Sequence, residues 1–76
     1  MSAPVVDISG KTVTYEGTAY VFRPLADDTF TVLVDGVPVG RAVYSFGAAN
    51  GVVEGSSVTE ETLTLLAEAW FAALDA

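Results

Sequence analysis

The segment that most constrains the fold of this 76-residue chain runs from Val58 to Leu74, because it alone has a clear helical start and period. Apolar residues recur there three and four positions apart, which places them on one side of an α-helix. The predicted core-facing residues are Leu63, Leu66, Ala67, Trp70, Phe71 and Leu74. We therefore expect a helix within residues 58–75 that packs on a sheet built from the preceding residues.

The predicted helix has two candidate N-caps. Thr59 can accept a hydrogen bond from the backbone N–H of Thr62. In the alternative register, Ser57 is the cap and Glu60 completes a Ser-x-x-Glu capping box. The two registers place the start of the helix within two residues of each other.

Further apolar residues extend beyond the core-facing stripe of the helix. An exposed leucine among alanines of high helix propensity is ordinary. The alternative interpretation is a second interface, through which the chain self-associates as a homodimer. The residues of this predicted self-association surface are Leu65, Ala69 and Ala72.

Four segments before the helix are predicted to form two β-hairpins. Residues 12–15 pair with 18–22 around Glu16-Gly17, and residues 30–34 pair with 37–39 around Asp35-Gly36. Two-residue connections with glycine in second place are typical of tight hairpins. Residues 5–8 and 52–53 are short candidate strands. The chain is thus predicted to be a single α+β domain, with an antiparallel sheet of four to five strands and one C-terminal helix on one face.

Strand alternation predicts which side chains face the core. The predicted core faces are Val13, Tyr15, Tyr20 and Phe22 in the first hairpin and Phe30, Val32, Val34, Val37 and Val39 in the second. Continued alternation would bury Arg41, so we expect a β-bulge near Gly40-Arg41 that turns Ala42, Tyr44 and Phe46 inward. Residues 23–28 and 47–51 are expected to be loops, and Pro38 to mark a sheet edge.

Composition excludes several classes of function. The chain has no cysteine and no histidine, and Ser45 therefore has no imidazole base to activate it. Ten acidic and three basic residues give a net charge of −7, which argues against direct binding to nucleic acid or anionic lipid. Neither a membrane-spanning run nor a signal peptide is recognisable, so we expect a cytoplasmic protein.

No residue pattern predicts a catalytic, cofactor or metal site. Asp27, Asp28 and Asp35 could form an acid–base pair or hold a hard cation, but their positions suit turns. The aromatic residues of the strands could form a stacking platform for single-stranded nucleic acid, but their alternation favours burial in the core. The chain is accordingly predicted not to be an enzyme.

The acidic residues have two interpretations. They can simply keep a hydrophobic small protein soluble. Alternatively, they bind a basic partner protein, and the predicted partner-binding residues are Asp27, Asp28, Asp35, Glu61, Glu68 and Asp75. The functional hypothesis is a non-catalytic protein-binding module. In its most concrete form it is an acidic inhibitor, of the kind that phages use against host defences such as CRISPR systems, that masks a nucleic-acid-binding surface. The alternative is an assembly subunit that self-associates through the outer face of the helix or through the sheet edge near Pro38.

These two hypotheses predict opposite effects of two sets of substitutions. Under the assembly hypothesis, Leu65→Glu abolishes self-association, measured as mass in solution by sedimentation equilibrium. Under the inhibitor hypothesis, Leu65→Glu leaves partner binding intact, whereas changing Asp27, Asp28 and Asp35 to lysine abolishes it. Both hypotheses are contradicted when neither set of changes alters binding.

Overall fold

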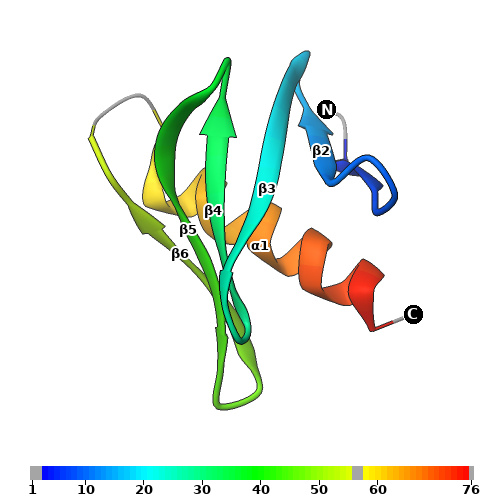
Figure 1. The fold of residues 1–76 in the computed structure, drawn as a ribbon, viewed down its shortest axis with the longest axis vertical. Coiled ribbons are helices and arrows are strands. Elements are labelled where there is room, and N and C mark those ends of the chain that lie inside the picture. The colour runs from blue at the N-terminus through cyan, green and yellow to red at the C-terminus, as the bar shows by residue number, and fades with distance from the viewer. Residues whose placement is uncertain (1–2, 56–57, 76) are drawn as a thin grey trace.

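The computed structural model describes residues 3–55 and 58–75, which form one six-stranded antiparallel sheet and one helix (Figure 1). The elements are β1 (Val5–Asp7), β2 (Thr12–Tyr15), β3 (Thr18–Ala26), β4 (Thr29–Val34), β5 (Val37–Ser45), β6 (Ala48–Val53) and α1 (Glu60–Leu74). Each strand pairs with the next along the chain, so the sheet order is the sequence order. The sheet curls into a half-barrel, and α1 packs against it, as the predicted α+β class requires.

Both predicted hairpins are present in the predicted register. Tyr15 pairs with Thr18 and Val34 pairs with Val37. The prediction of a loop over residues 47–51 is wrong, because the turn is Phe46-Gly47 and β6 starts directly after it. The β5–β6 hairpin was missed because phenylalanine is a poor residue for the left-handed conformation, φ 53°, that the first turn position requires.

The prediction of a loop over residues 23–28 is also wrong, because β3 continues through Pro24 to Ala26. The N–H of Phe22 donates to the carbonyl of Lys11 at 2.8 Å, near the end of the β2–β3 ladder. Backbone N–H groups point to alternate sides along a strand, so an N–H at position 24 would point to the same side as that of Phe22. β2 does not extend far enough to pair with position 24. A proline there loses no hydrogen bond and leaves no free donor on the open edge.

A β-bulge lies in β5, as predicted, one residue earlier than expected. Val32 pairs with Gly40 and Leu33 pairs with Pro38, so Val39 is the extra residue. The extra residue reverses the alternation of the strand, so Ala42 faces the core, where it is fully buried. Gly40 is the first residue of β5 that pairs with β6, and Pro38 precedes it. Pro38 therefore lies on a sheet edge, as predicted.

Besides Tyr44, which is 42% exposed, three residues predicted to face the core are exposed. Phe46 is 105% exposed at the tip of the β5–β6 hairpin, and Val37 is exposed beside the turn between β4 and β5. Leu74 is 43% exposed in the last turn of α1. Strand and helix alternation assigned all three inward, but each lies at the end of an element, where the opposing layer no longer covers it.

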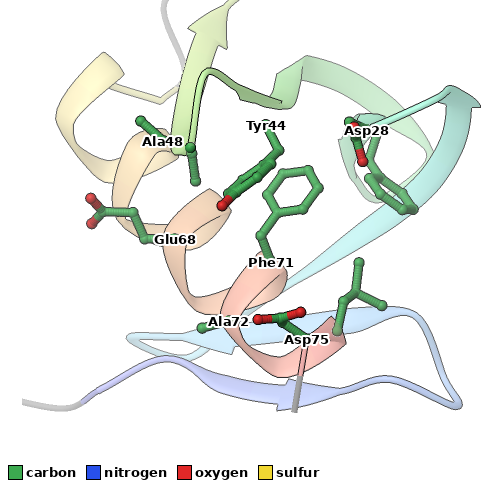
Figure 2. Close-up of a pocket in the computed structure, with 11 residues that line it drawn as sticks. Asp28, Tyr44, Ala48, Glu68, Phe71, Ala72 and Asp75 are labelled. Atoms are coloured by element: carbon green, nitrogen blue, oxygen red, sulfur yellow. The ribbon is translucent and has the colours of Figure 1, made fainter.

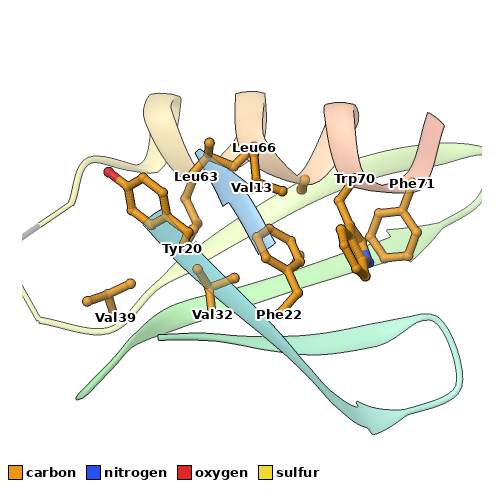
Figure 3. Packing of buried hydrophobic residues seen from close by; sticks show 11 residues of the cluster. Val13, Tyr20, Phe22, Val32, Val39, Leu63, Leu66, Trp70 and Phe71 are labelled. Carbon is orange, nitrogen blue, oxygen red and sulfur yellow. The ribbon is translucent and has the colours of Figure 1, made fainter. Parts of the chain in front are cut away.

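The core forms where the helix stripe meets the inward faces of the strands (Figure 3). Its largest fully buried side chains are Trp70, Phe22, Leu63, Leu66, Val13 and Val32. The Trp70 ring stacks on Phe22 with ring centroids 4.8 Å apart and meets the edge of Phe30 at 5.3 Å. Aromatic pairs at such distances add to the stabilisation from burial alone.

Thr59 is the N-cap of α1. Its hydroxyl oxygen accepts a hydrogen bond from the N–H of Thr62 at 3.1 Å. Glu60 and Glu61 occupy the first turn, where the helix dipole favours acidic side chains. The rival cap, Ser57, lies outside the described residues.

The backbone of α1 lies directly on β6 at Gly51. The Gly51 N–H donates to the Thr64 hydroxyl oxygen at 3.1 Å, so this edge-strand donor is satisfied by the helix. A Cβ atom on Gly51 would lie 2.6 Å from the carbonyl carbon of Leu63 and from the nitrogen of Thr64. Only glycine therefore permits this approach.

Gly51→Ala is predicted to push the helix away from β6 and to lower the free energy of unfolding by about 2 kcal/mol, as overpacked sites commonly do. Chemical denaturation followed by Trp70 fluorescence measures this change. Asn50→Ala, at the exposed neighbouring position, is the control, with an expected change within about 0.5 kcal/mol. Equal stabilities for the two variants would contradict the close approach.

Candidate functional site

A groove of about 740 Å³ lies beside the C-terminal half of α1. Three parts of the chain form its walls: the β3–β4 turn with the start of β4, the β5–β6 hairpin, and α1 from Glu68 onward. These parts meet because β6 runs alongside α1 in the opposite direction. Gly51 contacts Leu63 and Thr64, whereas Ala48 and Ala49 line the groove with the later helix residues.

Aromatic rings form the floor of the groove. The ring centroid of Phe71 lies 5.4 Å from that of Tyr44 and 5.7 Å from that of Phe30. Phe71 is almost buried, whereas Tyr44 is 42% exposed and keeps part of its ring accessible. A ligand that enters the groove therefore meets aromatic surface before it reaches the core.

Three carboxylates surround this aromatic floor. Asp28 comes from the β3–β4 turn, Glu68 from the middle of α1 and Asp75 from its C-cap. In Figure 2 they lie on different sides of the Tyr44 and Phe71 rings. None of the described residues that line the groove is basic. The groove is thus an apolar floor with an acidic rim.

The C-terminus of α1 adds to this negative potential. The last turn of a helix carries partial negative charge on its free carbonyl groups, which lysine or arginine usually offsets. The last turn of α1 has no basic residue, and the C-cap is Asp75. An acidic C-cap is locally unfavourable for the helix, and it places a carboxylate where the helix dipole is already negative.

The ion pair found among the described residues lies outside the groove. The Arg41 guanidinium meets the Glu54 carboxylate at 3.5 Å, with both side chains close to half exposed. Within residues 3–55 and 58–75, no ion pair engages the carboxylates of the groove rim. They are thus available to a cationic ligand.

The structure brings together three of the six predicted partner-binding residues, namely Asp28, Glu68 and Asp75. Asp27 shares the turn of Asp28 but does not line the groove. Asp35 lies in the β4–β5 turn at the opposite end of the sheet (Figure 1). Glu61 lies in the first turn of α1, beside a second, shallow depression.

The predicted self-association residues are divided between two sites. Leu65 is 38% exposed and lies in the shallow depression, whose other lining residues are Glu60, Glu61, Thr64 and Glu68. Ala72 is exposed and belongs to the wall of the groove, whereas Ala69 is half-buried. Acidic side chains therefore border the one large apolar residue of this surface.

Sequence reasoning assigned Tyr44 and Phe71 to the core and missed their role in the groove. Strand and helix alternation identifies the side that a residue faces, but not the point at which two layers diverge. The available signal was the pair of helix carboxylates, Glu68 in the middle of the helix and Asp75 at its C-cap, together with a last turn that has no basic residue.

Asp7 is the one group with a clearly shifted pKa among the described residues. Its Oδ1 accepts hydrogen bonds from the Gly10 N–H and the Ser9 hydroxyl, each at 3.0 Å. These bonds, that from Gly10 first, favour the carboxylate and lower the pKa of Asp7. Asp7 closes the β1–β2 turn and is not part of the groove.

The described residues contain no group of three or more potential metal ligands in a metal-binding arrangement. Across the same residues, no helix has both the length and the hydrophobicity to span a membrane. Comparisons with protein-family models, curated proteins and solved structures find no match to this chain.

Proposed function

We propose that this chain is a non-catalytic module that binds a basic segment of a partner protein in the groove. The observation that carries the proposal is the aromatic floor ringed by Asp28, Glu68 and Asp75, with no basic residue among the described lining residues. In its most concrete form the module is an inhibitor. It covers the basic surface with which a larger target holds nucleic acid, and the net charge of −7 favours that encounter.

The chemistry of the groove suits arginine better than an anionic or purely apolar ligand. A guanidinium can stack on the exposed face of Tyr44 while its hydrogen-bond donors reach a rim carboxylate. The apolar stem of the side chain then lies against the small residues of the walls, Ala48 and Ala72. Lysine offers the same charge but lacks the planar, bidentate head group.

The spacing of the helix carboxylates fits an extended segment. Glu68 and Asp75 are seven residues apart in α1, which corresponds to about 10.5 Å along the helix axis. A segment in the polyproline II conformation has three residues per turn and rises about 3.1 Å per residue, so residues three positions apart lie on one side of it, about 9 Å apart. Basic residues three positions apart in a partner segment of this conformation can therefore meet both carboxylates at once.

The test is binding of a fluorescein-labelled peptide of six arginines, measured by fluorescence anisotropy at about 0.1 M salt. The triple variant Asp28→Asn, Glu68→Gln and Asp75→Asn is predicted to weaken binding by about tenfold or more, from the loss of three charge pairs. For the unmodified protein and for the triple variant, binding of the peptide is expected to weaken as the salt concentration is raised to about 0.5 M.

A matched control has the same change in net charge away from the groove. It combines Glu16→Gln, Asp35→Asn and Glu61→Gln, and we expect it to lose no more than about threefold, because only the long-range field changes. Equal losses in the two triple variants would show that the peptide responds to net charge alone, and the groove would not be its site.

Self-association as an assembly subunit has weaker support. The partial exposure of Leu65 favours it, but Glu60, Glu61 and Glu68 border the same depression. Two copies meeting there would bring like charges together, which opposes association. A basic partner meets no such opposition.

A further inference from the structure

Phe46 is the most exposed large apolar residue of the described chain. It occupies the first position of the two-residue turn between β5 and β6, and its exposed fraction is 105%. Its backbone is left-handed, with φ 53°, and Gly47 follows with φ 77°. No residue within 3–55 and 58–75 covers its side chain.

Neither the turn nor the core accounts for a phenylalanine at this position. The left-handed conformation favours glycine, asparagine and aspartate, and it is strained for a bulky residue. The equivalent left-handed positions of the turns at residues 16–17 and 35–36, which also have glycine in second place, hold the polar residues Glu16 and Asp35. Scattered surface apolar residues are normal, but this one combines full exposure with an unfavourable backbone.

Phe46 is adjacent in the chain to residues that line the groove. The next two residues along the chain, Gly47 and Ala48, line the groove, and Tyr44, two residues earlier, lies in its floor. The tip of the hairpin therefore stands at the groove's edge. A partner that fills the groove passes within reach of Phe46.

We propose that Phe46 is an anchor that inserts into an apolar pocket of the same partner whose basic segment occupies the groove. This inference rests on the proposed function and adds to it the kind of surface that the partner presents: basic residues next to an apolar pocket. Single aromatic side chains at the centre of interfaces often carry much of the binding free energy.

A second copy of this chain is not the occupant. A twofold dimer that exchanged Phe46 between neighbouring grooves would bring two sets of rim carboxylates together, Asp28, Glu68 and Asp75 from each copy. Like charges opposed in this way work against such a dimer. A basic surface is attracted by the same carboxylates, so the charge of the groove selects a different protein.

The experiment compares two labelled peptides by anisotropy at about 0.1 M salt. One contains six arginines, and the other contains six arginines alternating with six leucines, which supply apolar contacts for Phe46. The unmodified protein is expected to bind the arginine–leucine peptide more tightly. Phe46→Asn is expected to lose about tenfold for that peptide, within the range of aromatic anchors, and to bind the six-arginine peptide as before.

Thermal unfolding separates an anchor from a structural residue. Asparagine suits the left-handed position, so Phe46→Asn is expected to unfold at the same or a higher temperature than the unmodified protein. Val37→Thr, which changes an exposed apolar residue beside the β4–β5 turn, is the control and should leave both affinities unchanged.

The possible outcomes are distinct. The anchor is overturned when Phe46→Asn keeps full affinity for the arginine–leucine peptide, when the unmodified protein binds the two peptides equally, or when the variant is less stable. The proposed function fails with it when the unmodified protein binds neither peptide. When the unmodified protein binds the six-arginine peptide but Phe46→Asn does not weaken binding of the arginine–leucine peptide, the anchor alone is removed and the proposed function stands.

Discussion

The direct contact between the backbone of α1 and Gly51 is the constraint on which the shape of the molecule depends. It holds the first half of the helix against the edge strand β6, where the Thr64 hydroxyl satisfies the Gly51 N–H. Gly40 on the neighbouring strand allows a similar approach, because a Cβ atom there would meet a Leu63 methyl group. The helix is thereby fixed at its N-terminal half. Its last turns extend over the β5–β6 hairpin, and the groove forms there.

This arrangement also protects the open sheet. A curled sheet that does not close into a barrel has two edges that can pair with other chains. Gly51 on one edge is covered by α1, and the unpaired halves of β3 and β5 carry Pro24 and Pro38 at the positions where a donor would face outward. The other edge strand, β1, is only three residues long, and a short edge strand offers little backbone for pairing.

Most of the fold could be predicted from local chemistry. The helix, its Thr59 cap and the two hairpins with polar turn residues followed from spacing and turn preference, and the unfavourable burial of Arg41 predicted the bulge. The missed elements have physical reasons. Pro24 is acceptable in a strand only because β2 ends beside it. The β5–β6 hairpin was not predicted because Phe46 is an unfavourable residue for the turn position that it occupies. The groove depends on where helix and sheet diverge, which no local pattern encodes.

The most direct test of the central claim is a ¹H–¹⁵N chemical-shift titration of the protein with the six-arginine peptide. Binding in the groove predicts that the shifted amides cluster at Asp28, Tyr44, Glu68 and Asp75, on three parts of the chain that only the folded state brings together. Shifts centred instead on Asp35 and Glu61, or spread over all acidic residues without a focus, would contradict it. The acidic residues would then serve solubility, and the groove would not be a binding site.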